Sequence, residues 1–367
     1  MIKILFFIDV ITGGGAEKVL RTLVNNMDQE KFDITVQTIE LAEPEQYLAE
    51  GIRYKAINRC KTAFGKKLFH YWVRLCAELK WLYPLYVKDN YDIEVAYLEF
   101  GPTKILAGST NQKAKKLAWV HCDLEKKTMA DPEKVRRQYQ NYDKVVCVSE
   151  TVKRSCRKVI GDSTDAVVVY NVNDETDILH KSAEHSVDKP EAVTFLAVGR
   201  LSYEKGNDRL LDACKLLLDD GYDFRLWLVG DGPEREKLTA QVSKQGLTDR
   251  VTFWGFQQNP YPYMRAADVI VTPSRYEGFS TVVTEALILG RPVVTTPCSG
   301  MDELLGDNAY GLITEDSTEG IYRGMRRMLE DQTLREHYAR KAAIRGKEFS
   351  KDTLVKQTEQ FFEELLK

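Results

Sequence analysis

The sequence lacks the marks of a small secreted or metal-stapled protein. Its seven cysteines are scattered over 367 residues and no two of them form a Cys-x-x-Cys pair, so neither a zinc site of that spacing nor a disulfide framework is encoded. Scattered cysteines of this kind are typical of a reducing cytosol, and we expect a cytoplasmic protein. No apolar run reaches the roughly 18 residues that a membrane-spanning helix needs. We therefore expect a protein that is soluble or peripheral to a membrane.

An excess of charge of either sign is also missing. Lys and Arg number 52 and Asp and Glu number 55, which gives a formal net charge of −3. This balance argues against a general nucleic-acid binder. Hydrophobic residues at 43% and charged residues at 29% are ordinary for globular proteins and exclude a disordered chain. At roughly 150 residues per domain, the length predicts two domains, each able to bury its own core.

Short apolar runs alternate with amphipathic helical patterns, which predicts parallel strands covered by helices on both faces. The runs lie at residues 2–8, 34–39, 93–98, 117–120, 145–148 and 166–170 in the first half, and at 193–198, 224–229, 251–254, 269–272 and 292–295 in the second. The first run has no cationic flank and no small-residue cleavage site, so we interpret it as a buried strand and not as a signal peptide. The expected fold class is α/β, with two doubly wound, Rossmann-like domains.

A polar stretch at residues 173–190 interrupts this pattern and is the best candidate for a linker. We expect an N-terminal domain at residues 1–180 and a C-terminal domain at 181–350. Residues 351–367 have a helical pattern, either for a helix that crosses back to the first domain or for one that stays on the second. Ligands of doubly wound domains bind beyond the carboxyl ends of the strands, so functional residues are expected in the loops that follow strands.

The first strand runs into three consecutive glycines, Gly13, Gly14 and Gly15, and then into a helical pattern. Glycines let the backbone come close to a ligand, and a helix N-terminus favours an anion. The pattern G-x-G-x-x-G is absent, which argues against an NAD-dependent dehydrogenase. A tight turn that binds nothing is the alternative interpretation of this loop.

The loop at residues 273–281 carries the most chemistry. Gly278 precedes the start of a helix whose first backbone N–H groups suit a phosphate; they belong to Phe279, Ser280 and Thr281. Glu277 stands just before that start and Glu285 in the second turn, which separates them by at most ~12 Å along the axis. One carboxylate could hold a sugar hydroxyl and the other a ribose, with a diphosphate between them. The alternatives are that Glu277 only caps the helix dipole and that Glu285 is a solvated helix residue.

Two further strand ends add positive charge and glycine. Arg200 follows the run at 193–198, Lys205 stands a few residues later, and Gly230 follows the run at 224–229. Two cations at one strand end could neutralise a diphosphate. Ordinary surface cations and a tight turn are the alternatives.

Together these motifs resemble the retaining GT-B glycosyltransferases of family 4. The resemblance is carried by GGGAEK at 13–18, YNVND at 170–174, VGRL at 198–201, EKG at 204–206, VGDGP at 229–233, PSRYEGFS at 273–280 and GRPVV at 290–294. It covers essentially the whole chain. Glu277 and Glu285 match the family's paired glutamates, often written E-x7-E.

The resemblance implies a role for each matched position, with the acceptor on the side of the first domain and the donor in the second. The implied catalytic residues are His121, Arg200, Lys205 and Glu277, and the implied donor-binding residues are Gly14, Gly15, Gly230, Phe279, Ser280, Thr281 and Glu285. Arg200 and Lys205 would bind the donor diphosphate and Glu277 the donor sugar. His121 matches the family histidine near the reacting carbon; a hydrogen-bonded core histidine is the alternative.

The implied reaction is retaining transfer of a hexose or N-acetylhexosamine from a nucleotide sugar to a lipid-linked saccharide, in the synthesis of cell-surface polysaccharide. Uracil is the base we expect. Arg200, Lys205 and the helix start near residue 280 could stabilise the departing phosphate without a metal ion. The sequence holds no Asp-x-Asp motif, so a metal clamp lacks support and no cofactor is expected.

Residues 53–88 are strongly basic, with Glu78 as the only acidic residue. Their apolar positions recur at helical spacing, at Leu68, Trp72, Leu75, Leu79 and Leu82. Such a segment can lie on an anionic membrane, which favours a lipid-linked acceptor at the inner face of the cell membrane. An ordinary helix packed on the sheet is the alternative.

Two other functions stay open at this point. One is a nucleotide-sugar epimerase on a similar fold, which would act on the donor without an acceptor. The other is a non-catalytic nucleotide-sugar-binding protein, against which the presence of Arg200, Lys205, Glu277 and Glu285 argues.

Overall fold

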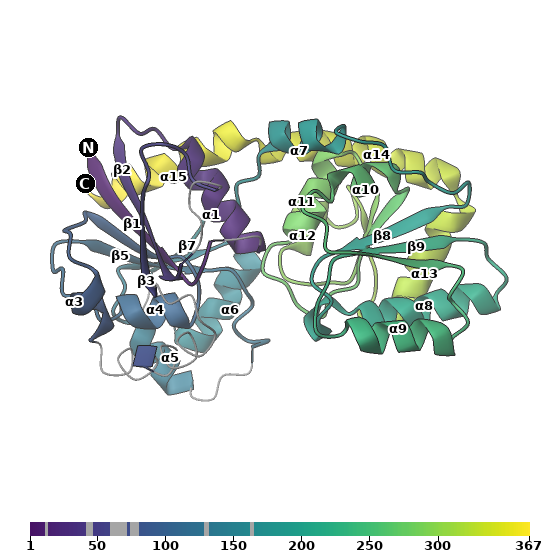
Figure 1. Ribbon diagram of the computed structural model, residues 1–367, viewed down its shortest axis with the longest axis horizontal. Coiled ribbons are helices and arrows are strands. Elements are labelled where there is room, and N and C mark those ends of the chain that lie inside the picture. Colours follow the sequence, from purple (N-terminus) through teal and green to yellow (C-terminus); the bar gives the residue numbers. More distant parts are fainter. Residues whose placement is uncertain (12–13, 42–46, 59–71, 74–80, 128–131, 162–164) are drawn as a thin grey trace. The chain divides into compact units, whose positions relative to one another are not determined.

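The structure is a computed structural model that describes residues 1–11, 14–41, 47–58, 72–73, 81–127, 132–161 and 165–367. The chain forms two compact units (Figure 1). The first contains Met1–Val172 and Asp352–Lys367, and the second contains Asn173–Lys351. Among the described residues, none of the helices combines the length and the apolar character needed to cross a membrane.

The division between the units differs from the linker expected near residue 180. Residues in that stretch form helix α7 (Glu175–Ser182) of the second unit. Its acidic residues have local roles, because the Asp174 side chain accepts a hydrogen bond from the backbone N of Asp177 at 3.0 Å and caps the helix. Negative charge in the first turn stabilises a helix. The polar residues at 174–177 are therefore those of a helix N-terminus, whereas residues 184–190 lie in the second unit without regular secondary structure.

A seven-stranded sheet forms the centre of the first unit, in the order β3-β2-β1-β4-β5-β6-β7. All neighbours are parallel. The strands are β1 (Ile2–Ile8), β2 (Phe32–Glu40), β3 (Arg53–Asn58), β4 (Ile93–Ala96), β5 (Lys115–Val120), β6 (Lys144–Cys147) and β7 (Asp165–Val168). The chain winds outward from β1 to β3 and then continues on the other side at β4. The carboxyl ends of β1 and β4 therefore flank the topological switch point, where open α/β sheets bind ligands.

The helices of the first unit are α1 (Gly15–Asn26), α3 (Leu82–Tyr86), α4 (Gly101–Leu106), α5 (Pro132–Tyr139), α6 (Glu150–Ile160) and, for residues 352 onward, α15 (Lys351–Leu365). Strand β3 is not among the strands that the sequence predicts, because its charged residues belong to the predicted basic amphipathic segment. It is an edge strand, and Arg53 pairs with Asp33 at 2.8 Å while Lys55 pairs with Asp89. An edge strand can carry such charges because part of it faces water.

The second unit has a six-stranded parallel sheet in the order β10-β9-β8-β11-β12-β13. Its strands are β8 (Thr194–Val198), β9 (Arg225–Val229), β10 (Val251–Gly255), β11 (Val269–Thr272), β12 (Val293–Thr295) and β13 (Leu312–Ile313). Besides α7, its helices are η2 (Tyr203–Lys205), α8 (Asn207–Asp219), α9 (Arg235–Lys244), α10 (Tyr261–Ala266), α11 (Thr281–Ile288), α12 (Met301–Leu305), α13 (Thr318–Glu330), α14 (Gln332–Gly346) and η3 (Lys347–Phe349). Here the switch point lies between β8 and β11.

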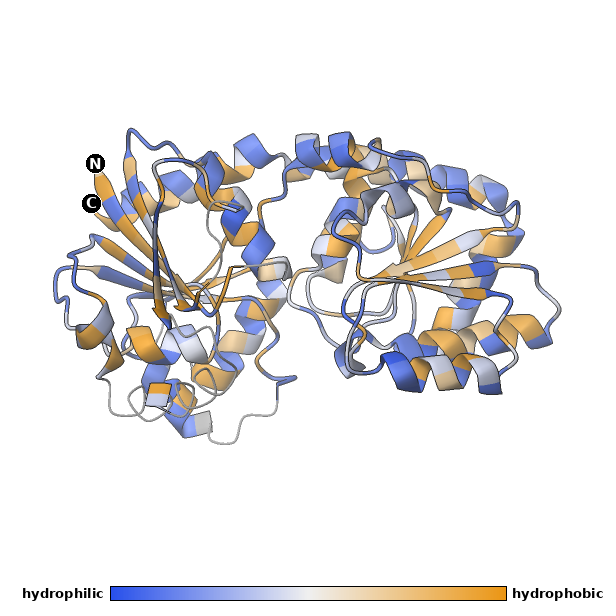
Figure 2. Cartoon of the chain, viewed as in Figure 1, coloured by the Kyte–Doolittle hydropathy of each residue, from blue (hydrophilic) through white to orange (hydrophobic). Residues whose placement is uncertain are grey.

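Apolar residues concentrate on the strands of both sheets, whereas helices such as α8 and α9 have one apolar and one polar face (Figure 2). In the second unit the core joins α8 and α13 to the sheet, with Leu210, Leu217 and Met325 fully buried beside Leu226. Burial of this kind is the main favourable contribution to folding. It holds the strand ends, and the loops that follow them, in fixed positions.

Helix α15 completes the core of the first unit. Phe362 is fully buried and makes edge-to-face contacts with Phe6, Phe32 and Trp119, at ring-centroid distances of 6.0, 6.4 and 6.5 Å. Such aromatic contacts stabilise beyond the area that they bury. The segment at the end of the sequence is thus part of the packing around β1.

Candidate active site

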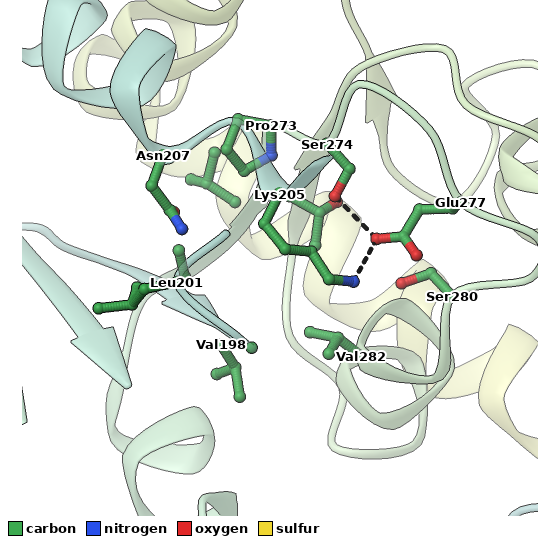
Figure 3. Close-up of a pocket in the computed structure, with 13 residues that line it drawn as sticks. Val198, Leu201, Lys205, Asn207, Pro273, Ser274, Glu277, Ser280 and Val282 are labelled. Carbon is green, nitrogen blue, oxygen red and sulfur yellow. Dashed lines mark hydrogen bonds and ion pairs between the residues drawn. The ribbon is translucent and has the colours of Figure 1, made fainter. Parts of the chain in front are cut away.

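Lys205 and Glu277 meet at the switch point of the second sheet. Lys205 ends η2, which follows β8, and Glu277 lies in the loop between β11 and α11. The Lys205 Nζ donates to Glu277 Oε1 at 2.6 Å, and the hydroxyl of Ser274 donates to the same oxygen at 2.7 Å (Figure 3). These residues line a pocket at the carboxyl ends of the two strands. The structure thus brings together two residues that stand 72 positions apart in the sequence.

The surroundings keep Lys205 charged. Burial by itself lowers the pKa of Lys205, but the negative charge of Glu277 and the hydrogen bond to it outweigh this effect, so the pKa is raised. An ammonium group held at a strand end, with limited access to water, interacts strongly with an incoming anion. The pair is therefore suited to receive a charged ligand.

A second ion pair fastens the loop of Lys205 to the loop of Glu277. The Arg275 guanidinium donates to both carboxylate oxygens of Asp208, at 2.8 and 2.7 Å, and to the carbonyl of Tyr203 at 2.7 Å. It also lies over the Tyr203 ring, 4.1 Å from its centroid. Two parallel hydrogen bonds to a carboxylate fix geometry as well as charge. This pairing was not predicted from the sequence, although Arg275 belongs to the same motif as Glu277.

Gly206 allows the two loops to approach. Its φ of +67° lies in the left-handed region, and a Cβ added there would stand 2.0 Å from the carbonyl oxygen of Pro273. Only glycine has both the conformational freedom and the small size that this contact requires. The glycine after Lys205 is thus explained by backbone packing in the second unit.

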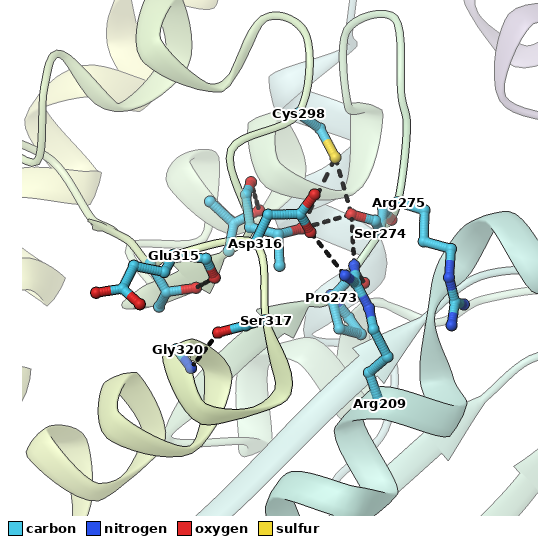
Figure 4. A network of polar contacts seen from close by, with 12 residues as sticks. Arg209, Pro273, Ser274, Arg275, Cys298, Glu315, Asp316, Ser317 and Gly320 are labelled. Carbon is cyan, nitrogen blue, oxygen red and sulfur yellow. Dashed lines mark hydrogen bonds and ion pairs between the residues drawn. The ribbon is translucent and has the colours of Figure 1, made fainter. Parts of the chain in front are cut away.

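The carbonyl of Ser274 is held by three donors (Figure 4). Arg209 donates to it at 3.2 Å, Thr296 Oγ1 at 2.5 Å and Cys298 Sγ at 2.8 Å. Arg209 also pairs with Asp316 at 2.6 Å. Because the hydroxyl of Ser274 bonds to Glu277, this network fixes the residue that orients the carboxylate. Arg209, Ser274 and Cys298 were not among the predicted site residues.

The N-terminus of α11 follows Glu277. Ser280 is its N-cap, and its hydroxyl accepts a hydrogen bond from Val283 N at 3.4 Å. Phe279 and Ser280 are buried, Thr281 is partly buried, and the Phe279 ring contacts that of Phe349 at 6.1 Å. The sequence predicts that the backbone N–H groups of residues 279–281 bind an anion. In the structure these residues lie at the start of α11, and a helix N-terminus favours an anion.

Glu285 is 5% exposed, so the alternative of a solvated helix residue is wrong. The hydroxyl of Tyr261, in α10, donates to Glu285 Oε1 at 3.2 Å. A buried carboxylate needs hydrogen-bond donors, and Tyr261 is one that is not among the predicted site residues. The signal was weak, because a tyrosine in an apolar helix is normally a core residue.

Arg200 and Gly230 differ in what surrounds them. Arg200 is exposed at the carboxyl end of β8, where a cation can reach a ligand. Gly230 has a φ of +138°, and a Cβ there would stand 1.9 Å from the carbonyl oxygen of Gly199. Close packing of the β8 and β9 ends therefore accounts for this glycine, whether or not a ligand also touches it.

The first unit carries the other predicted residues. His121 follows β5, and its ring lies 4.8 Å from that of Tyr97. Burial lowers the pKa of His121 to about 4, against the opposing effects of Glu99 and of a hydrogen bond with the backbone of Tyr97. Its Nε2 is buried and has no hydrogen-bond partner among the described residues. His121 is thus a neutral histidine with one unused ring nitrogen, unlike a fully hydrogen-bonded core histidine.

Gly14 and Gly15 lie at the N-terminus of α1 and are exposed. The backbone N of Gly14 donates to Glu17 Oε2 at 3.2 Å. The first part of the glycine loop, residues 12–13, lies outside the described residues. The same is true of residues 59–71 and 74–80, which make up most of the basic segment. Within the described part of the chain, no cluster of three or more His, Cys, Asp or Glu side chains is arranged to hold a metal ion.

Two family models match this chain. "Glycosyltransferase Family 4" matches residues 13–176, and "Glycosyl transferases group 1" matches residues 180–345. Among solved structures, sucrose-phosphate synthase from Thermosynechococcus elongatus has a TM-score of 0.81 at 19% identity and covers 99% of each chain. HepE from Anabaena, in complex with UDP and glucose, has a TM-score of 0.78 at 21% identity and covers 99% of this chain and 100% of that one. At these identities the structures show the fold.

Some related proteins match about half of this chain or less, and another matches nearly all of it. An N-acetylgalactosaminyltransferase of Campylobacter jejuni, named for a diphospho-undecaprenol substrate, is 36% identical over 186 residues, which is 50% of each chain. The alpha-D-kanosaminyltransferase of Streptomyces kanamyceticus is 34% identical over 40% of this chain and 39% of its own. The chain thus spans half or less of these two relatives. The amylovoran biosynthesis glycosyltransferase AmsD of Erwinia amylovora is 24% identical over 97% of this chain and 98% of its own.

Two doubly wound units with these strand orders, together with the matching structures, define the GT-B fold. The two family models cover nearly all of the sequence, and the chain belongs to glycosyltransferase family 4. The resemblance of the sequence to this family is therefore confirmed.

Proposed function

We propose that the protein transfers a hexose or N-acetylhexosamine from UDP to a lipid-linked saccharide, with retention of the anomeric configuration, in cell-surface polysaccharide synthesis. The observation that carries the proposal is the Lys205–Glu277 pair at the switch point of the second sheet. Support for the acceptor class comes from the name of the Campylobacter relative, which includes diphospho-undecaprenol. Support for UDP comes from the similar structure that binds it.

In this proposal the residues of the second unit act on the donor. Arg200 and Lys205 neutralise the diphosphate, and the N-terminus of α11, at Phe279, Ser280 and Thr281, adds backbone donors. Glu277 holds the sugar and Glu285, supported by Tyr261, holds the ribose. Gly230 keeps the strand end close to the donor. Lys205 forms an ion pair with Glu277, which holds its ammonium group in place. The diphosphate therefore binds at a cation whose position is already fixed.

The chemical step breaks the bond between the anomeric carbon and the phosphate oxygen. The acceptor hydroxyl attacks from the face that the phosphate leaves, and its proton passes to the departing phosphate. Charge that develops on this phosphate is stabilised by Arg200, Lys205 and the α11 dipole, which is how preorganised charges accelerate a reaction. We propose that this suffices without a metal ion. We also propose that His121 is a catalytic residue and that Gly14 and Gly15 bind the donor.

We further propose that the protein works at the cytoplasmic face of the membrane, where residues 53–88 contact anionic lipid. The described part of this segment carries exposed apolar side chains, with Trp81 60% and Leu85 49% exposed. Aromatic and basic residues together favour the membrane interface. Co-sedimentation with phosphatidylglycerol vesicles at low salt tests this part, with phosphatidylcholine vesicles as the control. Equal recovery with both lipids would contradict it and leave the transferase proposal standing.

Nucleotide release from a panel of nucleotide sugars, in excess chelator, tests the reaction. We expect release from one donor, and a loss of about 100-fold or more in Glu277→Gln, because the carboxylate acts on the transition state. Glu315→Gln is the matched control, since Glu315 is an exposed partner of Arg323. Turnover that needs added magnesium or manganese would contradict the metal-free mechanism. An isomerised donor sugar would indicate an epimerase, and nucleotide binding without turnover a binding protein.

A further inference from the structure

Phe100 occupies a distinctive place in the first unit. It lies between β4 and α4, at the carboxyl end of a strand that flanks the topological switch point. On one side, a Cβ added to Gly101 would stand 2.6 Å from a carboxylate oxygen of Asp9, which follows β1. On the other side, the carboxylate of Glu99 accepts a hydrogen bond from the backbone N of His121, which follows β5. Phe100 is therefore placed between the loop after β1 and His121.

The backbone of Phe100 is strained. Its φ of 67° and ψ of −91° correspond to a tight-turn conformation that side chains other than glycine rarely adopt. The segments on both sides are fixed: the hydroxyl of Thr103 donates to the carbonyl of Leu98 at 2.7 Å, and Lys104 N donates to the carbonyl of Phe100 at 2.9 Å. Strain of this kind persists where the surrounding structure imposes it, and such positions cluster at functional sites.

The side chain of Phe100 is directed to solvent and not to the core. It is 48% exposed, and the ammonium group of Lys127 lies 5.0 Å from the centroid of its ring. Both the strained backbone and the exposed apolar surface of the ring reduce the stability of the folded protein. The fold therefore holds an aromatic ring and a cation together at the ligand-binding edge of the first sheet.

We propose that Phe100 is a platform on which a pyranose ring of the acceptor packs, with Lys127 beside it to meet the phosphate that links the acceptor to its lipid. The C–H face of a pyranose is apolar and packs on an aromatic ring through desolvation and dispersion. A phosphate pairs with an ammonium group. This inference rests on the proposed transferase function. The residues assigned to the donor's diphosphate, sugar and ribose, namely Lys205, Glu277 and Glu285, belong to the second unit.

Two substitutions of Phe100 test the platform. Phe100→Gly removes the ring and suits the positive φ, so its melting temperature should equal or exceed that of the wild type. Its KM for the acceptor should rise at least tenfold, with the KM for the donor unchanged within twofold. Phe100→Trp keeps an aromatic surface and should stay within about threefold of the wild type in both constants. Ile344→Ala is the control, because Ile344 is an exposed apolar residue on α14 of the second unit.

A second readout uses binding without turnover. The probe is N-acetylglucosamine linked through diphosphate to a short prenyl chain, titrated calorimetrically into each variant without donor. We expect Phe100→Gly to bind it at least tenfold more weakly than the wild type, and Lys127→Met to lose several-fold more affinity for this probe than for the same sugar without phosphate. An unchanged acceptor constant in Phe100→Gly would overturn the inference, as would a rise in the donor KM alone, which would place the ring against the donor. If the wild type transfers sugar and Phe100→Gly gives either of these contrary results, only the platform is refuted. If the wild type transfers no sugar but binds the probe in a way that depends on Phe100, only the proposed function is refuted.

Discussion

Gly206 and Gly246 form a natural pair for testing how the two loops of the second unit are held together. Both have a left-handed backbone, with φ of +67° and +70°. A Cβ at Gly206 would stand 2.0 Å from the Pro273 carbonyl oxygen, whereas a Cβ at Gly246 would have no atom within 4 Å. Gly246→Ala therefore introduces backbone strain alone, and Gly206→Ala introduces the same strain together with a collision against backbone.

The expected magnitudes follow from this difference. Alanine in the left-handed region costs about 1–2 kcal/mol, which is the expected loss for Gly246→Ala. Forcing an extra methyl group into closely packed structure adds about 1–3 kcal/mol, so Gly206→Ala should lose about 2–5 kcal/mol in total. The displacement also moves Lys205, the preceding residue, away from Glu277. We therefore expect UDP to bind at least tenfold more weakly to Gly206→Ala and equally well to Gly246→Ala.

Two measurements check this reasoning. Native-state hydrogen exchange of peptides that cover β8 and β11 gives the loss of stability in the second unit, and calorimetric titration with UDP gives the affinity. Equal losses of stability in the two variants would show that the 2.0 Å approach is relieved at no cost. Normal UDP binding by a destabilised Gly206→Ala would show that the position of Lys205 does not depend on this contact.

Three further predictions concern charge and hydrogen bonding. Burial lowers the pKa of His121 to about 4, whereas an unfolded histidine has a pKa of about 6.5. Between these pH values the unfolded chain binds a proton that the folded chain does not, so the free energy of unfolding should fall as the pH drops from about 6.5 to about 4. His121→Gln should reduce this dependence of stability on pH, measured by urea titration at several pH values. Arg275→Lys keeps the charge but loses the forked contact with Asp208, so the KM for the donor should rise about 3- to 10-fold; adding Asp208→Asn should cost little more, and fully additive losses would refute the coupling. Tyr261→Phe removes the hydrogen bond to Glu285 and should weaken UDP binding several-fold with little change in kcat at saturating donor, whereas unchanged UDP affinity in a titration would exclude this positioning role.

The parallel sheets were predictable because their strands are buried on both faces and appear in the sequence as uninterrupted apolar runs. Strand β3 was missed because an edge strand can alternate charged residues such as Arg53 and Lys55 with others. Helix α7 was missed because the polar residues at its start, including the capping residue Asp174, are of the same types as those of a loop. Both errors occur where local composition does not distinguish between two structures, and only tertiary context decides.

The site shows a similar limit. Glu277 and Lys205 could be named because each lies in a short, recognisable motif after a strand. The pairing of Arg275 with Asp208 spans 67 residues and depends on β8 and β11 being neighbours in the sheet, which no local pattern encodes. The exposure and the positive φ of Phe100 are also invisible in the sequence, where a phenylalanine beside a strand is expected to be buried.

The contact of Phe362 with Phe6 has a consequence for the order in which the protein matures during synthesis. Residues of the first unit lie on both sides of the second in the sequence, so the ribosome delivers the whole second unit before the helix that covers β1. Domains usually fold as they emerge, with the N-terminal one first. Here the unit that starts first is finished last, and until Phe362 arrives the apolar surface around Phe6 and Phe32 stays uncovered. A nascent chain that stalls near residue 350 would thus have a complete second unit and a first unit with exposed apolar surface. Chaperones bind apolar surface of this kind.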